Sequence, residues 1–565
     1  MASITFDHLY GYDELTTALH SLASEHPTLL TVESIGRSHE GRDIWLATVT
    51  NQATGNALDK PAIWVDANIH SDEHTGSVAA LHLVHTLLTG YGTDAAVTRC
   101  VDTRTCYVVP RVNPDGAELA LAHPPTLLRS SVRPWPRVDD APGLVSHDLD
   151  GDGRVLTMRI VDPNGPWKTS DVDPRLLVAR APDEFDGGPF YRLLPEGTIR
   201  EFDGATVPIA PERRSLDLNR QFPAAWRPHG EQPGAGPFPL SEPETRAVAD
   251  ALVARPNVCC YFAHHTFSAA ILRPFDDRPD DEFPTVDLQR YKVLGARGSE
   301  LTGYPHVSVF HDFRYDPKDV ISGGADTWAY DHLGAFAWTT EFWSPLPHAG
   351  ITGVHLIDWF ADHPIDDERK LLAYSDSELG GTGFVDWYEV DHPQLGRVEL
   401  GGWDLLRFWF NPPDALIEAE ITPHAHWQIF CALSTPQLAI RNDIVDRIGP
   451  TTWRVRIVVQ NEGWLPTAVT QRAIDRKLVQ PVRVECELPA AAQLRSGTAV
   501  QELGHLPGRS RVSTTVADFG GFSEGTPDLA VADWTIEAPA GTTIEFVARH
   551  ERAGTVRRSV LLDAR

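Results

Sequence analysis

Cysteine is scarce in this sequence, with six residues among 565, and no two of them have CxxC spacing. So few thiols exclude a small disulfide scaffold, and we expect buried free thiols in a reducing compartment, with a Cys100 to Cys106 bridge as the alternative. No run approaches the roughly 20 apolar residues that span a bilayer, and the N-terminus lacks a basic segment followed by an apolar one. We therefore expect no membrane partner, no signal peptide and a cytoplasmic location.

Positive charge is also in short supply, because 49 Lys and Arg residues face 78 Asp and Glu residues. The net charge of −29 repels the phosphate backbone of nucleic acids, so no nucleic-acid partner is expected. Glycine and proline, at 43 and 44 residues, are too few for a low-complexity chain. The length suffices for two or more domains with large cores, whereas nothing indicates an oligomeric state.

The first part of the chain alternates strands and helices. Apolar periodicity predicts helices at 12–26 and 76–88 and strands at 31–35, 44–50, 61–68, 105–109, 258–263 and 335–340. Ser241 and Glu244 have the spacing of a helix capping box. This alternation predicts an α/β domain with a largely parallel or mixed sheet and a site at the strand ends.

Two segments depart from that pattern. Residues 123–211 are rich in Pro, Gly and Asp and too long for a connection, which indicates an ordered insertion. After residue 430 the chain turns to short alternating strands, which is typical of a β-sandwich. We therefore expect two domains, an α/β domain over residues 1–430 and a β-sandwich over residues 431–565.

Metal-binding side chains follow two of the buried strands. His70 and Glu73 stand three residues apart after the first, and the second ends at His264 and His265. A His and a Glu three apart are by themselves typical of a polar helix start. Two imidazoles and one carboxylate with an open fourth position, however, are a ligand set for catalytic zinc.

At this point the sequence resembles the zinc carboxypeptidases of the A and B type. The matching landmarks, in the family's order, lie at 36–42, 70–73, 113–116, 217–222, 241–244, 265–274 and 339–341. The resemblance covers roughly residues 10–345, apart from the insertion. It implies a mixed sheet flanked by helices, a Zn²⁺ cofactor, and metallocarboxypeptidase activity on a C-terminal peptide or related amide bond.

The family's zinc ligands carry over onto His70, Glu73 and His265. His265 is preferred to His264 because only that register places Ser268 where the family has it. His264 is then expected to pack or to support the site. The family's general base carries over onto Glu341, which would accept a proton from water and pass it to the leaving nitrogen.

The resemblance also implies substrate-binding residues. Asn219 and Arg220 match the pair that grips the terminal carboxylate, so the expected partner is a peptide or peptide-like substrate with a free C-terminal carboxylate. The family uses a further arginine to stabilise the oxyanion. The insertion destroys the spacing to it, and among the candidates Arg159, Arg200, Arg213 and Arg214 we favour Arg159.

Several positions depart from the family pattern. Asp72 replaces an arginine before the metal-binding glutamate, and Asp319 stands where a substrate-capping tyrosine is expected, with Tyr315 as the nearest substitute. Asp326 matches a pocket-floor residue, where an acid favours a basic side chain. A one-residue shift would instead make Asp326 an aspartate that braces the loop, and both registers remain open.

The insertion contains the first half of a calcium loop. Asp148, Asp150 and Asp152 alternate along it, and Gly153 permits a sharp turn, but the twelfth position is Arg159 rather than glutamate. Either a calcium ion, with Asp203 as a candidate distal ligand, or a plain Asp-Gly turn fits this pattern.

Two other functions fit parts of the sequence. The altered cleft at Asp72 and Asp319 allows an amidase acting on a cell-wall peptide or an aminoacyl conjugate. A non-catalytic binding protein would keep the fold and the zinc, but it would have no need of Glu341. Because function resides in the site rather than in the fold, the three ligands together with Glu341 favour an enzyme.

Overall fold

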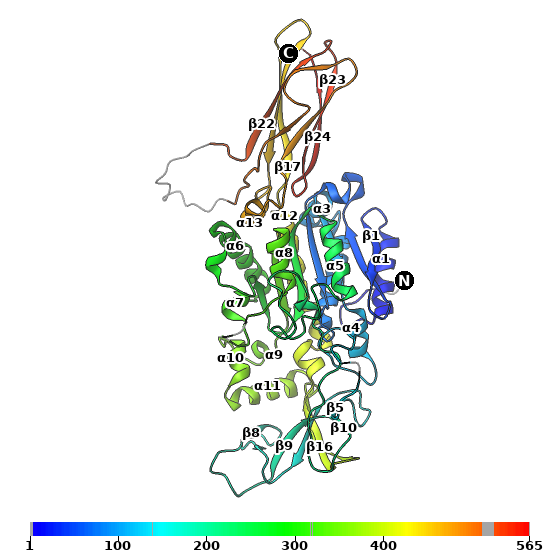
Figure 1. The fold of residues 1–565 in the computed structure, drawn as a ribbon, viewed down its shortest axis with the longest axis vertical. Helices are drawn as coiled ribbons and strands as arrows, with labels where there is room; N and C mark the ends of the chain where they lie inside the picture. The colour runs from blue at the N-terminus through cyan, green and yellow to red at the C-terminus, as the bar shows by residue number, and fades with distance from the viewer. Residues whose placement is uncertain (1–3, 138, 317, 319, 511–524, 564–565) are drawn as a thin grey trace.

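The computed structural model describes residues 4–137, 139–316, 318, 320–510 and 525–563. Along its long axis the molecule has three parts, with a helix-covered sheet in the centre, smaller sheets at one end and the C-terminal strands at the other (Figure 1). Within the described residues, no helix is long and apolar enough to cross a membrane. All six cysteines are buried and free, as predicted, and the Sγ atoms of Cys100 and Cys106 lie 4.0 Å apart.

The centre of the molecule is an eight-stranded mixed sheet. Its strands, in spatial order, are β1 (Leu30–Arg37), β2 (Asp43–Val49), β4 (Thr105–Val109), β3 (Ala62–Ala67), β11 (Val258–Thr266), β14 (Phe336–Phe342), β12 (Ala270–Arg273) and β13 (His306–Ser308). The four middle strands, β4, β3, β11 and β14, run parallel to one another. Their carboxyl ends therefore meet at one edge, where ligands bind in sheets of this kind.

Helices pack against this sheet. They are α1 (Tyr12–Glu25), α2 (His74–Gly90), α3 (Ala95–Thr103), α4 (Pro114–Leu121), α5 (Pro243–Val253), α6 (Thr285–Thr302), α7 (Val309–Asp312), α8 (Ala325–Leu333) and α12 (Ile417–Ser434). Every residue of β3, β11 and β14 is buried, as expected for strands covered by helices on both faces.

The predicted capping box at Ser241 and Glu244 is wrong. The residue at the N-cap position of α5 is Glu242, but its carboxylate caps no backbone N–H and is bonded instead to Arg133 and to the Ser241 hydroxyl. The Glu244 carboxylate turns away and accepts a hydrogen bond from the backbone N–H of His39 at 2.7 Å. Tertiary partners have therefore drawn both acidic side chains away from the helix end.

The predicted insertion is ordered and forms the accessory sheets at one end of the molecule (Figure 1). One sheet pairs β5 (Gly143–Ser146) with β10 (Gly197–Arg200). The other contains, in spatial order, β15 (Phe384–His392), β16 (Gly396–Trp403), β6 (Thr157–Val161), β9 (Phe190–Pro195), β7 (Trp167–Thr169) and β8 (Leu177–Ala179). Strands β15 and β16 come from a later part of the chain, so the insertion shares its sheet with residues 384–403.

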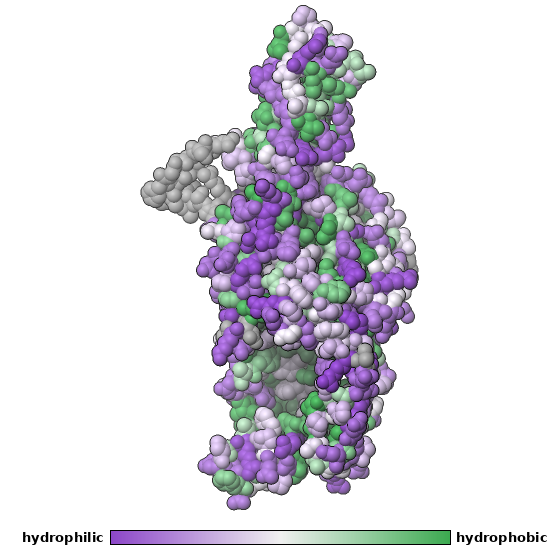
Figure 2. Space-filling view, in the orientation of Figure 1, coloured by the Kyte–Doolittle hydropathy of each residue, from purple (hydrophilic) through white to green (hydrophobic). Residues whose placement is uncertain are grey.

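Three helices follow β14, and a π-helical turn follows β16. The helices are α9 (Pro345–His348), α10 (Leu356–Ala361) and α11 (Ile365–Glu378), and the π-helical turn is η5 (Leu405–Phe410). Figure 2 shows that this face of the molecule is hollowed between the central part and the accessory end.

The C-terminal part consists of two four-stranded antiparallel sheets. The first contains β17 (Leu438–Arg447), β18 (Thr452–Asn461), β22 (Leu529–Glu537) and β20 (Gln493–Ser496). The second contains β21 (Val500–Glu502), β19 (Arg483–Glu487), β23 (Thr543–His550) and β24 (Gly554–Leu561), and a short helix, α13 (Gln471–Asp475), precedes it. The side chains of Trp453, Trp534 and Phe546 belong to one shared apolar core.

Buried arginines join the C-terminal strands to the central part. The Arg104 guanidinium donates to the Ala432 carbonyl and the Gln437 side chain, and Arg552 donates to the Gly334 carbonyl at 2.7 Å. The predicted fold class, a mixed α/β sheet flanked by helices with C-terminal antiparallel sheets, is confirmed. The boundary at residues 430 and 431 stays a prediction, and it falls within α12.

Candidate metal and substrate site

Three predicted metal ligands meet at the carboxyl ends of the parallel strands. His70 and Glu73 lie in the turn between β3 and α2, and His265 is the penultimate residue of β11. The Nδ1 atom of His70 lies 2.8 Å from Glu73 Oε1 and 3.1 Å from His265 Nδ1. The Nδ1 atom of His265 lies 3.0 Å from Glu73 Oε2.

The chemistry of this cluster fits a divalent cation. All three side chains are buried, and their ligand atoms lie within 4.8 Å of one another. Glu73 Oε2 is buried with the His265 ring nitrogen 3.0 Å away, but that contact does not have hydrogen-bond geometry. A cation among these atoms would offset the cost of burying the carboxylate. Two imidazole nitrogens and a carboxylate are the donors of a His₂Glu zinc site.

Asp217 supports His70 from the other side of the ring. Its Oδ1 lies 3.2 Å from His70 Nε2, which fixes the ring orientation and leaves Nδ1 facing the cluster. Burial by itself would raise the pKa of Asp217, but the Arg220 guanidinium, His70 and Arg129 hold it well below its usual range. The sequence analysis included residue 217 in a landmark but gave it no role.

His264 faces away from the cluster. Successive side chains of a strand point to opposite faces, so His264 and His265 cannot both reach the site. The His264 ring contacts the Gly76 carbonyl and the Gln428 side chain, and burial lowers its pKa to about 3. His264 therefore occupies a packing position as a neutral ring.

Glu341 lies beside His265. The two residues are register partners on β11 and β14. Burial, reinforced by the charge of Glu73, raises the pKa of Glu341 to about 7. A carboxylate with this pKa can exchange a proton at neutral pH, as a general base must.

The predicted carboxylate-binding pair lies at a cavity of about 50 Å³ that adjoins the cluster. Asn219 and Arg220 both line it, as do His265 and Glu341. The Arg220 guanidinium donates to the Asn219 carbonyl at 2.8 Å, and the Asn219 side-chain oxygen accepts from the backbone N–H of Ala325. Asn219 therefore also holds the turn that precedes α8.

Two carboxylates lie together in the same cavity wall. Asp326, predicted at a pocket floor, is accompanied by Asp276, which follows β12. Burial and the Asp326 charge raise the pKa of Asp276 well above its usual range. Asp326 also accepts hydrogen bonds from the Thr327 backbone and the Thr339 hydroxyl, so it both faces the cavity and braces the loop. Sequence reasoning missed Asp276.

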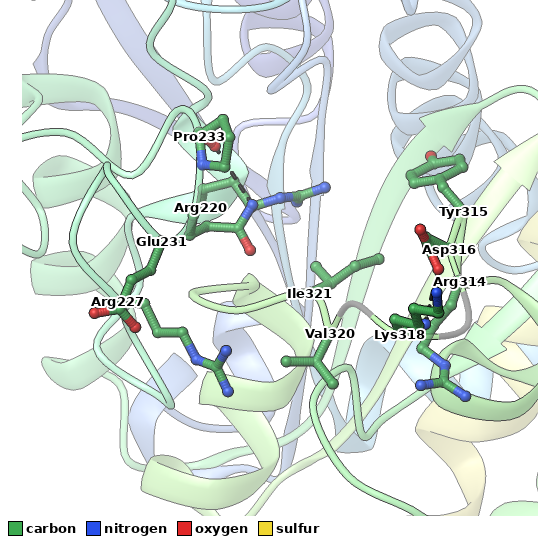
Figure 3. Close-up of a pocket in the computed structure, with 11 residues that line it drawn as sticks. Arg220, Arg227, Glu231, Pro233, Arg314, Tyr315, Asp316, Lys318, Val320 and Ile321 are labelled. Atoms are coloured by element: carbon green, nitrogen blue, oxygen red, sulfur yellow. Dashed lines mark hydrogen bonds between the residues drawn. The ribbon is translucent and has the colours of Figure 1, made fainter.

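Tyr315 lines the cavity and also a larger pocket of about 230 Å³ beside it. Figure 3 shows Arg220 and Arg227 on one side of the larger pocket and Tyr315 and Arg314 on the other, with Ile321 between them. Tyr315 is 65% exposed, so its ring is accessible to a ligand in either space. Asp319 lies outside the described residues.

The prediction for Arg159 is corrected by its position. Arg159 belongs to β6 in the accessory sheet, where its guanidinium forms a two-pronged ion pair with Glu399 and stacks on Tyr191 and Trp387. It does not line the cavity. Arg200 and Arg213 are likewise engaged elsewhere, in ion pairs with Asp140.

Arg129 lies next to the cluster, where an arginine that stabilises the oxyanion is expected. Its Nη1 lies 3.2 Å from Glu73 Oε1 and its Nε 3.4 Å from Asp217 Oδ2, and the side chain lines the cavity. The side chain is 43% exposed, so it can reach a ligand without leaving the site.

Asp72 is buried next to the cluster. Burial and the charge of Glu73 raise its pKa to about 6, and its Oδ1 has no hydrogen-bond partner among the described residues. It does not line either pocket. The departure at this position therefore alters the surroundings of Glu73 rather than the cavity wall.

A second acidic group lies in the insertion. Asp148 and Asp150 approach Glu196, with ligand oxygens within 4.8 Å of one another, whereas Asp152 and Asp203 are not in the group. The Asp148 carboxylate accepts hydrogen bonds from Gly151 and Gly153, and Glu196 accepts from two further backbone N–H groups. Glu196 is distant in sequence from the loop, so spacing alone does not reveal it.

Comparison with known proteins identifies the family. The family model described as "Zinc carboxypeptidase" matches residues 15–141 and 205–350. Carboxypeptidase B of Astacus astacus is 35% identical over 343 residues, which cover 59% of this chain and 85% of that protein. The chain belongs to the zinc carboxypeptidase family. A second model, for a domain of unknown function, matches residues 437–561.

Relatives of lower sequence identity are also similar to this chain. Carboxypeptidase A2 of Rattus norvegicus is 25% identical over 336 residues, or 58% of this chain, and the match spans only 61% of that relative. The crystal structure of thrombin-activatable fibrinolysis inhibitor aligns with 76% of this chain and 75% of its own at 16% identity, with a TM-score of 0.43. The family match also includes Arg129, which lies before its interruption at residue 141.

Proposed function

We propose that this zinc carboxypeptidase-family protein is a metallocarboxypeptidase that hydrolyses the peptide or related amide bond before a free C-terminal carboxylate. One observation carries the proposal: the convergence of His70, Glu73 and His265 next to Glu341, a buried carboxylate with a pKa of about 7. A binding protein would need the three ligands but not a base tuned to neutral pH.

The metal would be held by His70, Glu73 and His265, with Asp217 orienting the His70 ring. When bound, zinc polarises the scissile carbonyl and lowers the pKa of a water molecule toward neutrality. Glu341 accepts the proton from the attacking water and delivers it to the leaving nitrogen. Arg129 donates hydrogen bonds to the oxygen on which negative charge develops.

The substrate would be oriented by its terminal carboxylate. Arg220 presents a planar guanidinium in the cavity, which suits two-pronged binding of a carboxylate, and Asn219 assists it. The Tyr315 ring is accessible enough to cover the bound end. This arrangement restricts cleavage to the last residue of a chain.

The side chain of that residue is proposed to be basic. Asp276 and Asp326 place two carboxylates in one cavity wall, and the raised pKa of Asp276 means that the empty pair retains a proton. A lysine or arginine side chain would replace that proton as the single positive charge between the two carboxylates, and the proton would be released to solvent.

Calcium binding in the insertion is a separate proposal. Asp148, Asp150 and Glu196 would supply the ligands, so the set differs from the predicted Asp148, Asp150 and Asp152. Oxygen ligands at a glycine-containing turn suit Ca²⁺. The backbone hydrogen bonds that these carboxylates already accept support the alternative of a plain turn.

Product analysis tests the activity. We would incubate the zinc-loaded protein with a mixed library that includes linear, branched and D-amino-acid peptides, and identify products by mass spectrometry, with Glu341→Gln as the control. Release of single C-terminal residues from linear peptides supports a carboxypeptidase. Cleavage confined to branched or D-amino-acid peptides would show an amidase, and no product beyond the control would indicate a binding protein.

A further inference from the structure

The helix that begins directly after the metal-binding turn lacks its usual cap. The residue at the N-cap position of α2 is Glu73, and its side chain accepts no hydrogen bond from the first turn of the helix. An N-cap side chain normally accepts from the backbone N–H two or three residues on. The Glu73 carboxylate cannot do so here because it points into the cluster, 2.8 Å from His70 and 3.0 Å from His265.

Asn411 supplies the missing cap from a distant part of the chain. Its Oδ1 accepts from the backbone N–H of Thr75 at 2.9 Å and from the Thr75 hydroxyl at 2.9 Å. Thr75 is two residues after the N-cap, so this is the N–H that a capping side chain would have bonded. Asn411 and Thr75 are 336 positions apart in sequence.

The other half of the Asn411 amide holds the turn itself. Its Nδ2 donates to the Asp72 carbonyl at 2.8 Å and to the Leu406 carbonyl at 3.0 Å. The side chain is fully buried, and these four bonds use both donors and both lone pairs of an amide. Asn411 thus forms hydrogen bonds with residues on both sides of Glu73 and is not among the residues that line the cavity.

The anchoring segment is itself fixed. Asn411 directly follows the π-helical turn η5, whose first turn is capped by the Asp404 carboxylate accepting from the Arg407 backbone N–H. Both residues lie beyond residue 350, where the match to the zinc carboxypeptidase family model ends. The metal-binding turn therefore depends on a part of the chain that the family model does not include.

We propose that Asn411 is a positioning residue that caps α2 in place of Glu73 and thereby keeps the Glu73 carboxylate free to bind zinc. The inference rests on the proposed zinc site. Without Asn411 the Thr75 N–H would be buried and unpaired, and the side chain placed to satisfy it is that of Glu73 itself. Capping and metal binding would then compete for one carboxylate.

The test is zinc affinity, measured by competition with a chelator and without substrate. Asn411→Ala is expected to weaken zinc binding by about 10- to 100-fold, the usual effect of losing a group that supports a metal ligand. Asn411→Asp keeps an acceptor for Thr75 but loses both donor bonds, to the Asp72 and Leu406 carbonyls, so its zinc affinity should fall between those of the wild type and Asn411→Ala.

Asn461 provides a matched control for a purely structural effect. It is also buried, its Nδ2 donates to the Leu465 and Leu506 carbonyls, and its Oδ1 accepts from the backbone N–H groups of Gln437 and Gly463. Asn461→Ala should lower the Tm of the metal-free protein about as much as Asn411→Ala. Its zinc affinity should not change.

The outcomes separate the inference from the proposed function. The proposed zinc site is wrong if the wild type binds no zinc. It is also wrong if His265→Ala binds zinc as tightly as the wild type does. If the wild type binds zinc as proposed but Asn411→Ala binds it within twofold, or Asn411→Asp loses as much affinity as Asn411→Ala, the capping role is overturned. Should Asn411→Ala fail to fold, the affinity of Asn411→Asp decides the matter.

Discussion

His265 and Glu341 are register partners on the neighbouring parallel strands β11 and β14. Side chains at paired positions of a sheet point to the same face, so the register that delivers the imidazole to the cluster also delivers the carboxylate. A slip of one residue in β14 would turn Glu341 to the opposite face and replace it with Thr340 or Phe342. One backbone pairing therefore sets both the proposed ligand and the proposed base.

The first prediction separates the two adjacent histidines. His265→Ala should lose most bound zinc and all hydrolysis, because it removes one of three protein ligands. His264→Ala should keep stoichiometric zinc and lose only stability, since that ring packs behind the strand. Metal content after dialysis measures both variants, and zinc retained by His265→Ala with loss in His264→Ala would reverse the assignment.

The second prediction concerns the base and its pH dependence. Glu341 must be ionised to accept a proton. Its pKa is about 7 in the metal-free site, and bound zinc favours the ionised form, so kcat/KM should fall about tenfold per pH unit on an acid limb that lies below pH 7. Glu341→Gln keeps the shape of the side chain and should bind zinc while kcat drops at least about 100-fold. If kcat/KM falls at low pH in Glu341→Gln as it does in the wild type, another group causes that fall.

A third prediction contrasts two arginines. Arg129→Ala should lower kcat by about 10²- to 10³-fold with zinc retained, as expected for a donor to a developing oxyanion. Arg159→Ala should leave kcat unchanged and lower the Tm, because Arg159 pairs with Glu399 in the accessory sheet. Steady-state kinetics on one dipeptide distinguishes the two variants. A larger loss of kcat in Arg159→Ala than in Arg129→Ala would favour Arg159 as the donor to the oxyanion.

The fourth prediction addresses the last residue of the substrate. Peptides ending in Lys or Arg should have at least about tenfold higher kcat/KM than those ending in Leu or Phe, and Asp276→Asn should remove that advantage. Asp326→Asn tests the alternative role of Asp326. If it lowers the Tm but preserves the preference for basic residues, Asp326 only braces the loop. A panel with no preference in the wild type contradicts a basic pocket.

The fifth prediction treats the insertion. If Asp148, Asp150 and Glu196 bind calcium, a concentration 100 times the Kd should stabilise the folded protein by about 2.7 kcal/mol, seen as a higher Tm. Asp150→Ala should abolish the rise without changing zinc content. If calcium does not change the Tm of the wild type, the loop is a plain turn that binds no calcium.

Local patterns in the sequence predicted much of the fold. The strand expected at 105–109 is β4 (Thr105–Val109), and the helix expected at 12–26 is α1 (Tyr12–Glu25). Periodicity works here because each element buries one continuous set of apolar residues. The same reasoning gave no sign that β16 pairs with β6, because partners on distant strands leave no mark in a local pattern.

The site divides in the same way. The predictions for His70 and Glu73 come from one shared turn, and the choice of His265 and Glu341 comes from family landmarks; the roles of all four stay predictions. Arg129 was missed because the insertion was taken to start at residue 123, although the family match continues to residue 141. Asp276 and Asn411 were missed because each acquires its role only through a partner distant in sequence.

The order of the parallel strands also bears on how the protein is made. Strands β3 and β11 lie side by side, yet nearly two hundred residues of chain separate them, and contacts between such distant segments form slowly during folding. During synthesis, His70 and Glu73 leave the ribosome long before His265, and Asn411 follows later still. If the proposed zinc site is right, a nascent chain has no complete ligand set, and tight uptake of the metal would mark the moment at which the central sheet and the segment that carries Asn411 have both come together.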